Sequence, residues 1–313
     1  MAASTAAVTA LAPADGHSHR GRLLLAGGAR TTIHVGCYDA EHTEIRVAVL
    51  PGQQRLEPWC ARRGVAEALV GGFFTRPEGT PLGEVRTHGV VREHVPFDAP
   101  WHAIRACVHV EGGVARIARR DDLDPEPRGD LLQAGPVLVA DGDVAYDPQA
   151  DAEGFRAAAH QFDPDPSDGR HPRAALGLVD GRIVAFACDG RSRRDAGLTL
   201  VELARLMAAL GCEHAINLDG GGSTALISGG RLQNLPRGAF EVPEPGGRPI
   251  STALEFRAGE VRKATGMFTA WSRIGHRRRG PSWGSRSSRV AAPRMSRATS
   301  RPRSAAPAGT SRS

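Results

Sequence analysis

The sequence predicts an α+β fold in which curved mixed or antiparallel sheets have helices packed on them. Short apolar runs such as residues 106–110 and 137–140 recur between turn signals, a pattern typical of strands. Residues 200–210 instead carry apolar side chains at helical spacing. With 313 residues, 41% of them hydrophobic, the chain can bury a substantial core as one large domain or two halves.

The helix at residues 200–210 has clear end signals. Thr199 and Glu202 form the Ser/Thr-x-x-Glu pattern of a capping box, in which each side chain binds the backbone of the other residue. Gly211 stands where a left-handed C-terminal cap belongs. We therefore expect a strand to begin soon after it.

Two predicted strands end in a carboxylate followed by glycine. Residues 214–218 read as a short strand that delivers Asp219 to its end, and residues 182–188 form a strand that closes on Asp189. Polar groups at strand ends are well placed to line a cleft, because the sheet holds the wet loops at its rim rigid.

A weak internal sequence similarity suggests two pseudo-repeated halves around one cleft, and chance similarity is the alternative explanation. Each half reads strand, turn, helix, strand and glycines. The first comprises residues 45–52, an apolar segment at 65–69, and Gly71 with Gly72; the second comprises residues 182–190, 200–210 and 220–222. Residues 250–256 read as the last strand.

The run at residues 217–224 joins Asp219 to three glycines. Glycine allows a ligand to approach the main chain closely, so that consecutive N–H groups can converge on an anion such as phosphate. The alternative is a glycine-rich hairpin or bulge with a capping aspartate. A nucleotide-binding loop is disfavoured, because no Gly-Lys-Ser/Thr follows.

The motifs together resemble the phosphodiester glycosidase family over residues 45–256. They occur in the family's order and approximate spacing: His171-Pro172-Arg173, Gly177, residues 179–182, 189–191, 199–211 and 217–224, Asn234 and residues 248–251, with residues 71–74 and 135–139 upstream. Two positions depart from the family pattern. Val70 replaces an asparagine, and Ala174 replaces a threonine or serine.

The resemblance implies a hydrolase that cleaves the glycosidic bond of a sugar-1-phosphodiester. Such a reaction needs donors that stabilise the phosphate leaving group and a carboxylate near the oxocarbenium-like centre. The implied catalytic residues are Asp219, with Asp189 as its partner. The implied substrate-binding residues are Arg173, Arg191, Asn217, Gly220, Gly221, Gly222, Ser223, Gly71, Gly72, Asn234 and Arg248, with Arg173 and Arg191 binding phosphate and residues 220–223 forming an amide cradle.

Alternatives to these roles stay open. The departures at Val70 and Ala174 fit a catalytically silent module that binds sugar phosphates or glycans. Asp189 before glycine is also a common turn residue, and the arginines can be surface ion-pair residues. Asn234 can hold a loop instead of a sugar hydroxyl. The identity of the nucleophile and the stereochemical outcome are left open as well.

The charge of the chain is divided unevenly. Residues 261–313 contain thirteen Arg or Lys and no Asp or Glu, and subtracting them from the net charge of +6 leaves −7 on residues 1–260. We expect a disordered segment at 1–20, a phosphodiester glycosidase-like domain at 21–258 and a disordered basic tail at 259–313. A solvated extension is favoured over a nucleic-acid-binding arm.

Neither a metal nor another cofactor is expected, although a divalent cation near Asp189 or Asp219 is left open. The five cysteines are widely spaced without any Cys-x-x-Cys pair, and His160 and His171 lack ligand spacing. The start of the chain is a poor secretory signal, and no run approaches the roughly 20 apolar residues of a membrane span. We therefore expect a cytoplasmic protein whose oligomeric state the sequence leaves open.

Overall fold

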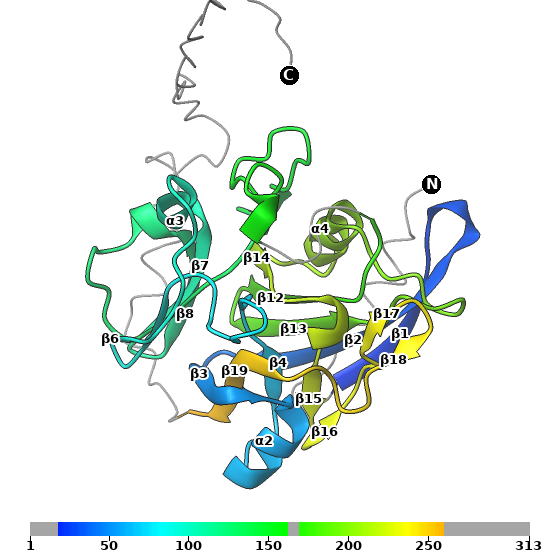
Figure 1. The fold of residues 1–313 in the computed structure, drawn as a ribbon, viewed down its shortest axis with the longest axis horizontal. Coiled ribbons are helices and arrows are strands. Elements are labelled where there is room, and N and C mark those ends of the chain that lie inside the picture. The colour runs from blue at the N-terminus through cyan, green and yellow to red at the C-terminus, as the bar shows by residue number, and fades with distance from the viewer. Residues whose placement is uncertain (1–17, 162–168, 260–313) are drawn as a thin grey trace, which may run out of the picture.

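The computed structural model describes residues 18–161 and 169–259, which form three antiparallel sheets and a few short helices (Figure 1). The largest sheet has seven strands. Their spatial order is β1 (Ser18–Leu24), β2 (Arg30–Asp39), β13 (Arg182–Cys188), β12 (Arg173–Val179), β14 (His214–Asn217), β10 (Val137–Ala140) and β11 (Asp143–Val144).

The second and third sheets have five strands each. The second runs β16 (Arg231–Leu232), β15 (Leu226–Ser228), β4 (Ala68–Val70), β19 (Ile250–Ala258) and β3 (Thr43–Gln54). The third runs β6 (Val90–Val91), β5 (Val85–Thr87), β9 (Asp130–Gln133), β7 (Ala106–Glu111) and β8 (Val114–Arg119), and a separate hairpin pairs β17 (Arg237–Ala239) with β18 (Val242–Pro243). Each pair of named strands is antiparallel, as one of the two expected arrangements requires.

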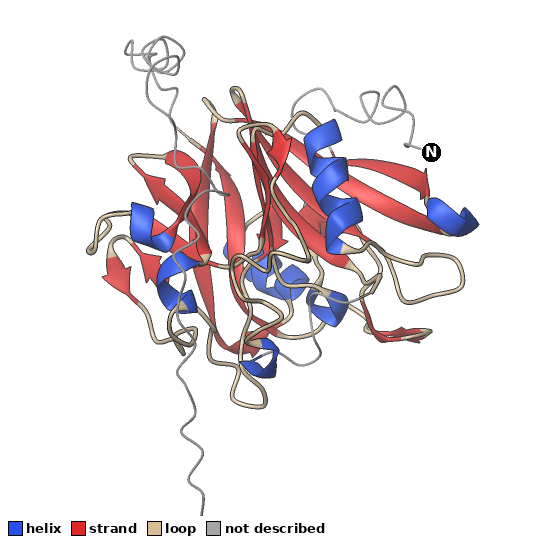
Figure 2. Cartoon of the chain, turned by 90° about the horizontal axis from the view of Figure 1, so that it is seen from above, coloured by secondary structure: helices blue, strands red, loops and turns tan. Residues whose placement is uncertain are grey.

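The helices are short, and strands account for far more of the described chain than helices do (Figure 2). The α-helices are α2 (Leu56–Arg63), α3 (Trp101–Ile104) and α4 (Leu200–Ala209). Single 3-10 turns are η1 (Ala26–Gly28), η2 (Arg120–Asp122), η3 (Ala159–Gln161) and η4 (Gly221–Ser223). Among the described residues no helix is long and apolar enough to cross a membrane.

One hydrophobic core joins all three sheets. It contains Leu176 and Ile216 from the first sheet, Leu69 and Leu254 from the second, and Val108 from the third. Because alternate side chains of a strand point to opposite faces, the central strands of the first sheet also bury their other face. The helix α4 covers that face.

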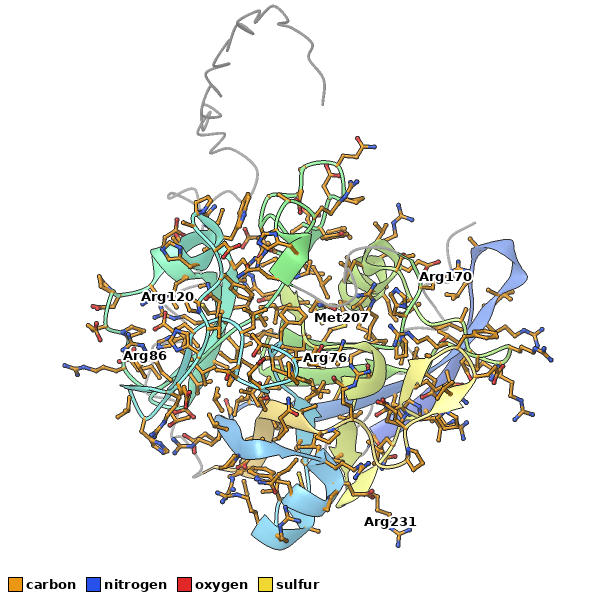
Figure 3. The ribbon with its side chains drawn as sticks, viewed as in Figure 1. Arg76, Arg86, Arg120, Arg170, Met207 and Arg231 are labelled. Atoms are coloured by element: carbon orange, nitrogen blue, oxygen red, sulfur yellow. The ribbon has the colours of Figure 1, made fainter. Side chains whose placement is uncertain are left out.

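The capping box predicted for α4 is confirmed. The Thr199 hydroxyl accepts a hydrogen bond from the Glu202 N–H, and the Glu202 carboxylate accepts one from the Thr199 N–H at 3.0 Å. Gly211 has the expected left-handed φ of 85°. Met207 points from the helix toward the sheet, where the helix packs with Phe186 in a second hydrophobic cluster (Figure 3).

The expected counterpart of this helix in the first half was misplaced. The helix α2 spans Leu56–Arg63, whereas Ala68–Val70 forms the strand β4. Pro58 falls in the first turn of α2, where a proline is tolerated because the N–H that it lacks would have no partner in the helix. The expected pseudo-repeat of two halves is not shown by the structure.

The boundaries of the domain differ slightly from the expected ones. Residues 18–20 of the predicted N-terminal segment already belong to β1, and β19 ends at Ala258, where the expected domain ends. The rest of the predicted N-terminal segment and almost all of the basic tail, at residues 1–17 and 260–313, lie outside the described residues.

Candidate functional site

Asp219 lies where the first and second sheets meet. The preceding residue, Leu218, is fully buried, and its N–H donates to the carbonyl of Ala174 at 2.9 Å, which extends the pairing of β14 with β12. The N–H of Asp219 then donates to the carbonyl of Gly71 at 3.0 Å, just beyond β4. The two glycine segments singled out in the sequence therefore come together at this carboxylate.

Burial raises the pKa of the Asp219 carboxyl to about 6. The nearby Ser223 hydroxyl, the Gly220 N–H, Arg248 and Arg76 act in the opposite direction, because each favours the ionised form. The Gly220 N–H donates to Asp219 Oδ1 at 2.8 Å. The exposed Arg76 is labelled near the middle of Figure 3. Asp219 therefore titrates close to neutral pH, as suits a catalytic carboxyl.

Buried polar atoms without hydrogen-bond partners occur in the chain segment that contains Asp219. Within the described residues, Asn217 Oδ1, Ser223 Oγ and Thr224 Oγ1 are buried and make no hydrogen bond of good geometry. The Ser223 hydroxyl nevertheless lies close enough to Asp219 to lower the pKa of its carboxyl. Because buried polar groups in native proteins are nearly always paired, such a cluster marks a place for a polar ligand or ordered water.

Arg191 is held beside the glycine run. It has a left-handed φ of 54°, and its guanidinium donates to the carbonyls of Gly238 and, at 3.3 Å, Arg237. A Cβ atom on Gly221 would lie 2.9 Å from Arg191 Nη1, so the absence of a side chain there allows the close approach. Burial and the neighbouring Arg248 lower the pKa of Arg191, whereas two nearby carboxylates raise it.

Arg248 and Glu244 lie beside the next glycine. The Arg248 N–H donates to the Gly222 carbonyl at 2.9 Å, and its Nη2 atom lies 3.6 Å from Glu244 Oε1. A Cβ atom on Gly222 would lie 2.0 Å from Glu244 Oε2 and 3.0 Å from Arg248 Nη2. The glycine run therefore provides the space in which two guanidinium groups and a second carboxylate approach Asp219.

Asp189 is not part of this charge cluster by any described contact. Its carboxylate is buried, accepts a hydrogen bond from the Leu235 N–H at 2.6 Å, and lies 3.4 Å from His34 Nε2. Asp189 ties β2 and β13 to the loop that leads to β17. Its expected role as the catalytic partner of Asp219 stays a prediction.

Arg173 is also engaged inside the protein. Its side chain is buried, Nε donates to the Leu198 carbonyl at 3.1 Å, and Nη2 lies 3.3 Å from the Gly169 carbonyl. Its Cδ atom passes 3.9 Å from the position of a Cβ on Gly220. Through these contacts the guanidinium supports the loops behind the glycine run, and its predicted phosphate contact stays a prediction.

The predicted amide cradle is not formed as expected. The Gly220 N–H is bound by Asp219, the Gly221 N–H donates to the Pro172 carbonyl at 2.9 Å, and the Ser223 N–H donates to the Gly220 carbonyl at 3.1 Å. The Asp219 carboxylate can accept from the N–H of the next residue because the chain turns into η4 directly after Gly220. These amides hold the turn and are not aimed together at a ligand.

Three further predicted binding residues have structural partners. The N–H groups of Gly71 and Gly72 donate to the backbone carbonyl and the hydroxyl of Thr252 at 2.9 and 3.0 Å. Asn234 accepts from the Leu226 N–H at 3.0 Å and donates to the Thr224 carbonyl at 2.8 Å. In this structure these hydrogen bonds hold the backbone segments around the site in place.

Asn217 has a divided role. Its Nδ2 atom donates to the Gly135 carbonyl at 2.9 Å, while Oδ1 belongs to the partnerless group described above. Val70 and Ala174, the two departures from the family pattern, are fully buried in the core. They therefore present no side chain to this site.

Sequence reasoning missed Glu244. It precedes Arg248 by four residues in a segment rich in Gly and Pro, and outside a helix such spacing carries no information about placement. Among the described residues, no three His, Cys, Asp or Glu side chains gather as a metal-ligand set.

Comparison with known proteins identifies the family of this chain. A sequence profile of the phosphodiester glycosidases matches residues 63–257. Mouse N-acetylglucosamine-1-phosphodiester alpha-N-acetylglucosaminidase is 27% identical over 184 residues, which are 55% of this chain and 34% of the mouse protein. A prophage-derived uncharacterized protein of Bacillus subtilis is 39% identical over 71 residues, 22% of this chain and 11% of that protein. The matches thus span about a third or less of these curated relatives.

Solved structures share the fold. The catalytic domain of zebrafish N-acetylglucosamine-1-phosphodiester alpha-N-acetylglucosaminidase, auto-inhibited by its pro-peptide, superimposes with a TM-score of 0.59 at 20% identity, covering 78% of this chain and 83% of that one. A hypothetical protein from Synechocystis gives a TM-score of 0.53 at 16% identity, covering 77% and 61%. The profile match covers more than half of the chain, and this protein therefore belongs to the phosphodiester glycosidase family.

Proposed function

We propose that this protein hydrolyses the glycosidic bond of a sugar-1-phosphodiester. The observation that carries the proposal is Asp219, a half-buried carboxyl with a pKa raised to about 6 by burial, beside the guanidinium groups of Arg191 and Arg248. The mouse relative, named for N-acetylglucosamine-1-phosphodiester, makes N-acetylglucosamine a reasonable first sugar to test. The substrate would be a small molecule or a glycan that carries the phosphodiester.

The proposed reaction breaks the bond between the anomeric carbon and the phosphate oxygen. Water supplies a hydroxyl to the sugar, and the phosphate departs as a monoester. Arg191 and Arg248 would stabilise the charge that develops on the leaving group, since guanidinium donors act strongly in a partly desolvated site. A phosphate ester leaves readily, so a strong general acid is not required.

Asp219 would act in its ionised form near the oxocarbenium-like centre. A carboxylate there can attack the anomeric carbon, activate the water, or stabilise the positive charge electrostatically. The partnerless oxygens of Asn217, Ser223 and Thr224 would accept or share hydrogen bonds with the sugar hydroxyls. Arg173, Asn234, Gly71 and Gly72 would support this arrangement through the backbone.

The first test measures free sugar released from a panel of α-linked sugar-1-phosphodiesters. We expect Asp219→Asn to lower turnover by about 10³-fold while the protein stays folded, because the amide can neither carry the charge nor take up a proton. Asp180→Asn makes the same chemical change at an exposed turn between β12 and β13 and serves as the matched control.

Full activity in Asp219→Asn would overturn the assignment of this carboxylate. Binding of the substrates without turnover by the unaltered protein would instead identify a silent sugar-phosphate or glycan-binding module. A truncation after Glu260 separates any contribution of the basic tail, and we expect it to leave sugar release unchanged.

A further inference from the structure

Glu244 occupies a place that two glycines leave open. A Cβ on Gly222 would lie 2.0 Å from Glu244 Oε2, and a Cβ on Gly238 would lie 2.6 Å from Oε1. The carboxylate is therefore sandwiched between the glycine run and the strand β17. It faces the same space as Arg248, whose Nη2 lies 3.0 Å from the Gly222 Cβ position.

The contacts of this carboxylate leave much of its negative charge without a partner. Glu244 Oε1 lies 3.6 Å from Arg248 Nη2, which is an ion pair without a hydrogen bond. Glu244 Oε2 is buried and has no hydrogen-bond partner in the described part of the chain. A structural carboxylate normally binds donors through both oxygens, as Asp189 does through the Leu235 N–H and His34 Nε2.

Two carboxylates oppose an anion at Gly221 and Gly222 when Asp219 is ionised. Arg191 and Arg248 supply two positive charges there, Asp219 and Glu244 supply two negative ones, and Arg76 adds a positive charge near Asp219. A singly charged anion can pair with the arginines at moderate cost. A doubly charged anion at the same position meets twice the repulsion from each carboxylate, because Coulomb energy scales with the product of the charges.

We propose that Glu244 makes this site select singly charged phosphodiesters over doubly charged phosphomonoesters. This inference rests on the proposed function, in which the arginines bind the phosphate of the substrate. A phosphodiester carries one negative charge at neutral pH, whereas the second ionisation of a phosphomonoester, with a pKa of about 6, gives it two.

The same selection favours release of the product. Hydrolysis uses one water to convert a sugar-1-phosphodiester monoanion into a free sugar and a phosphomonoester monoanion. Above pH 6 that monoester loses a proton to solvent and becomes a dianion. Glu244 then repels the product more strongly than the substrate, so the product does not accumulate in the site.

The test uses two small anions whose binding requires no turnover. Dimethyl phosphate stands for the monoanion and methyl phosphate for the dianion, both titrated at pH 8 into the full chain and followed by NMR or calorimetry. We expect Glu244→Gln to tighten dimethyl phosphate by about 5-fold and methyl phosphate by about 25-fold, because removing one negative charge relieves twice as much repulsion for the dianion.

Two further variants serve as controls. Glu241→Gln removes the same charge from an exposed residue of the same hairpin, whose carboxylate binds the Arg193 N–H, and should leave the ratio of the two affinities unchanged. Glu244→Asp keeps the charge and should keep the preference for the monoanion.

An unchanged ratio in Glu244→Gln, or an equal shift in Glu241→Gln, would overturn the proposal. If neither anion binds to the unaltered protein or to any variant, both the anion site and the proposal that rests on it would be overturned. Anion selectivity that responds to Glu244 in a protein that releases no sugar would support the selectivity while refuting the hydrolase.

Discussion

At the scale of single residues, two aspartates with the same local sequence have different surroundings. Both Asp219 and Asp189 come just after a strand and precede a glycine. Asp189 is fully enclosed by His34 and the Leu235 N–H, and so its carboxylate holds a loop. Asp219 stays half-buried near Arg248, Arg76 and the Ser223 hydroxyl. The difference arises from residues far away in the chain, which no local pattern reveals.

The raised pKa of Asp219 predicts how activity depends on pH. If the ionised carboxylate is the active form, kcat should rise through an acid limb near pH 6, about two units above an ordinary aspartate. Kinetics on a sugar-1-phosphodiester between pH 4 and 9 measure this limb. An acid limb at pH 4 would show that burial does not perturb this carboxyl during turnover.

The same pKa predicts a cost in stability. The folded-state pKa lies above the unfolded value, so folding favours the protonated form, and the contribution of Asp219 to stability is lost as pH rises from about 4 through about 6. Asp219→Asn should therefore be more stable than the unaltered protein at pH 8 by about 1–2 kcal/mol, after discounting for solvent screening, and not at pH 4. Urea unfolding at both pH values tests this, and a difference independent of pH would contradict it.

At the scale of secondary-structure elements, the site depends on how closely β4 and β19 approach. Gly71 donates to Thr252 and accepts from the Asp219 N–H, so one residue links β19, the end of β4 and the segment that carries Asp219. A Cβ there would lie 2.5 Å from Thr252 Oγ1 and 2.7 Å from the Thr252 carbonyl carbon. Backbone on one side and a buried hydroxyl on the other leave no room for a side chain.

We therefore expect Gly71→Ala to destabilise the protein by about 3 kcal/mol and to reduce sugar release, because β19 must move to admit the methyl group. Gly259→Ala is the matched control, since its nearest neighbour would be an ordinary 3.5 Å away at Glu44 N. Urea midpoints of both variants measure the effect. Equal midpoints would show that the two strands separate without cost.

At the scale of the whole molecule, a buried polar link joins the third sheet to the first. Glu153 accepts hydrogen bonds from the Ala106 N–H of β7 at 2.9 Å and the Val137 N–H of β10 at 2.6 Å. Arg105 lies fully buried between the rings of Phe97 and Phe155, 4.1 Å from each centroid. It donates to the carbonyls of Glu153 and Gly154 at 3.0 Å. The link passes directly behind the segment that supports Asn217.

Replacing Arg105 by lysine should destabilise the protein by about 2–4 kcal/mol, because an ammonium cannot keep both carbonyl contacts and the stacking on two rings. Arg231→Lys makes the same change at an exposed position, labelled in Figure 3, and should cost less than about 0.5 kcal/mol. Urea unfolding compares the two. A similar small effect for both would show that the third sheet does not depend on this link.

The sequence by itself determined the elements whose signals are local: the capped helix α4, the strands β10 and β13, the start of β19, and the placement of Asp219 just after a strand. The order of the motifs along the chain also indicated the family, because that order can be read from the sequence without knowledge of any tertiary contact. Only the tertiary structure decided which charges meet. It placed Glu244 beside Gly222 and Arg248, and it gave Asp189 and Arg173 hydrogen-bond partners from distant segments, because antiparallel sheets bring together residues far apart in the chain. Likewise, the Gly220 amide donates to the Asp219 carboxylate and the Gly221 and Ser223 amides donate to backbone carbonyls, since a folded backbone satisfies its own donors wherever acceptors lie within reach.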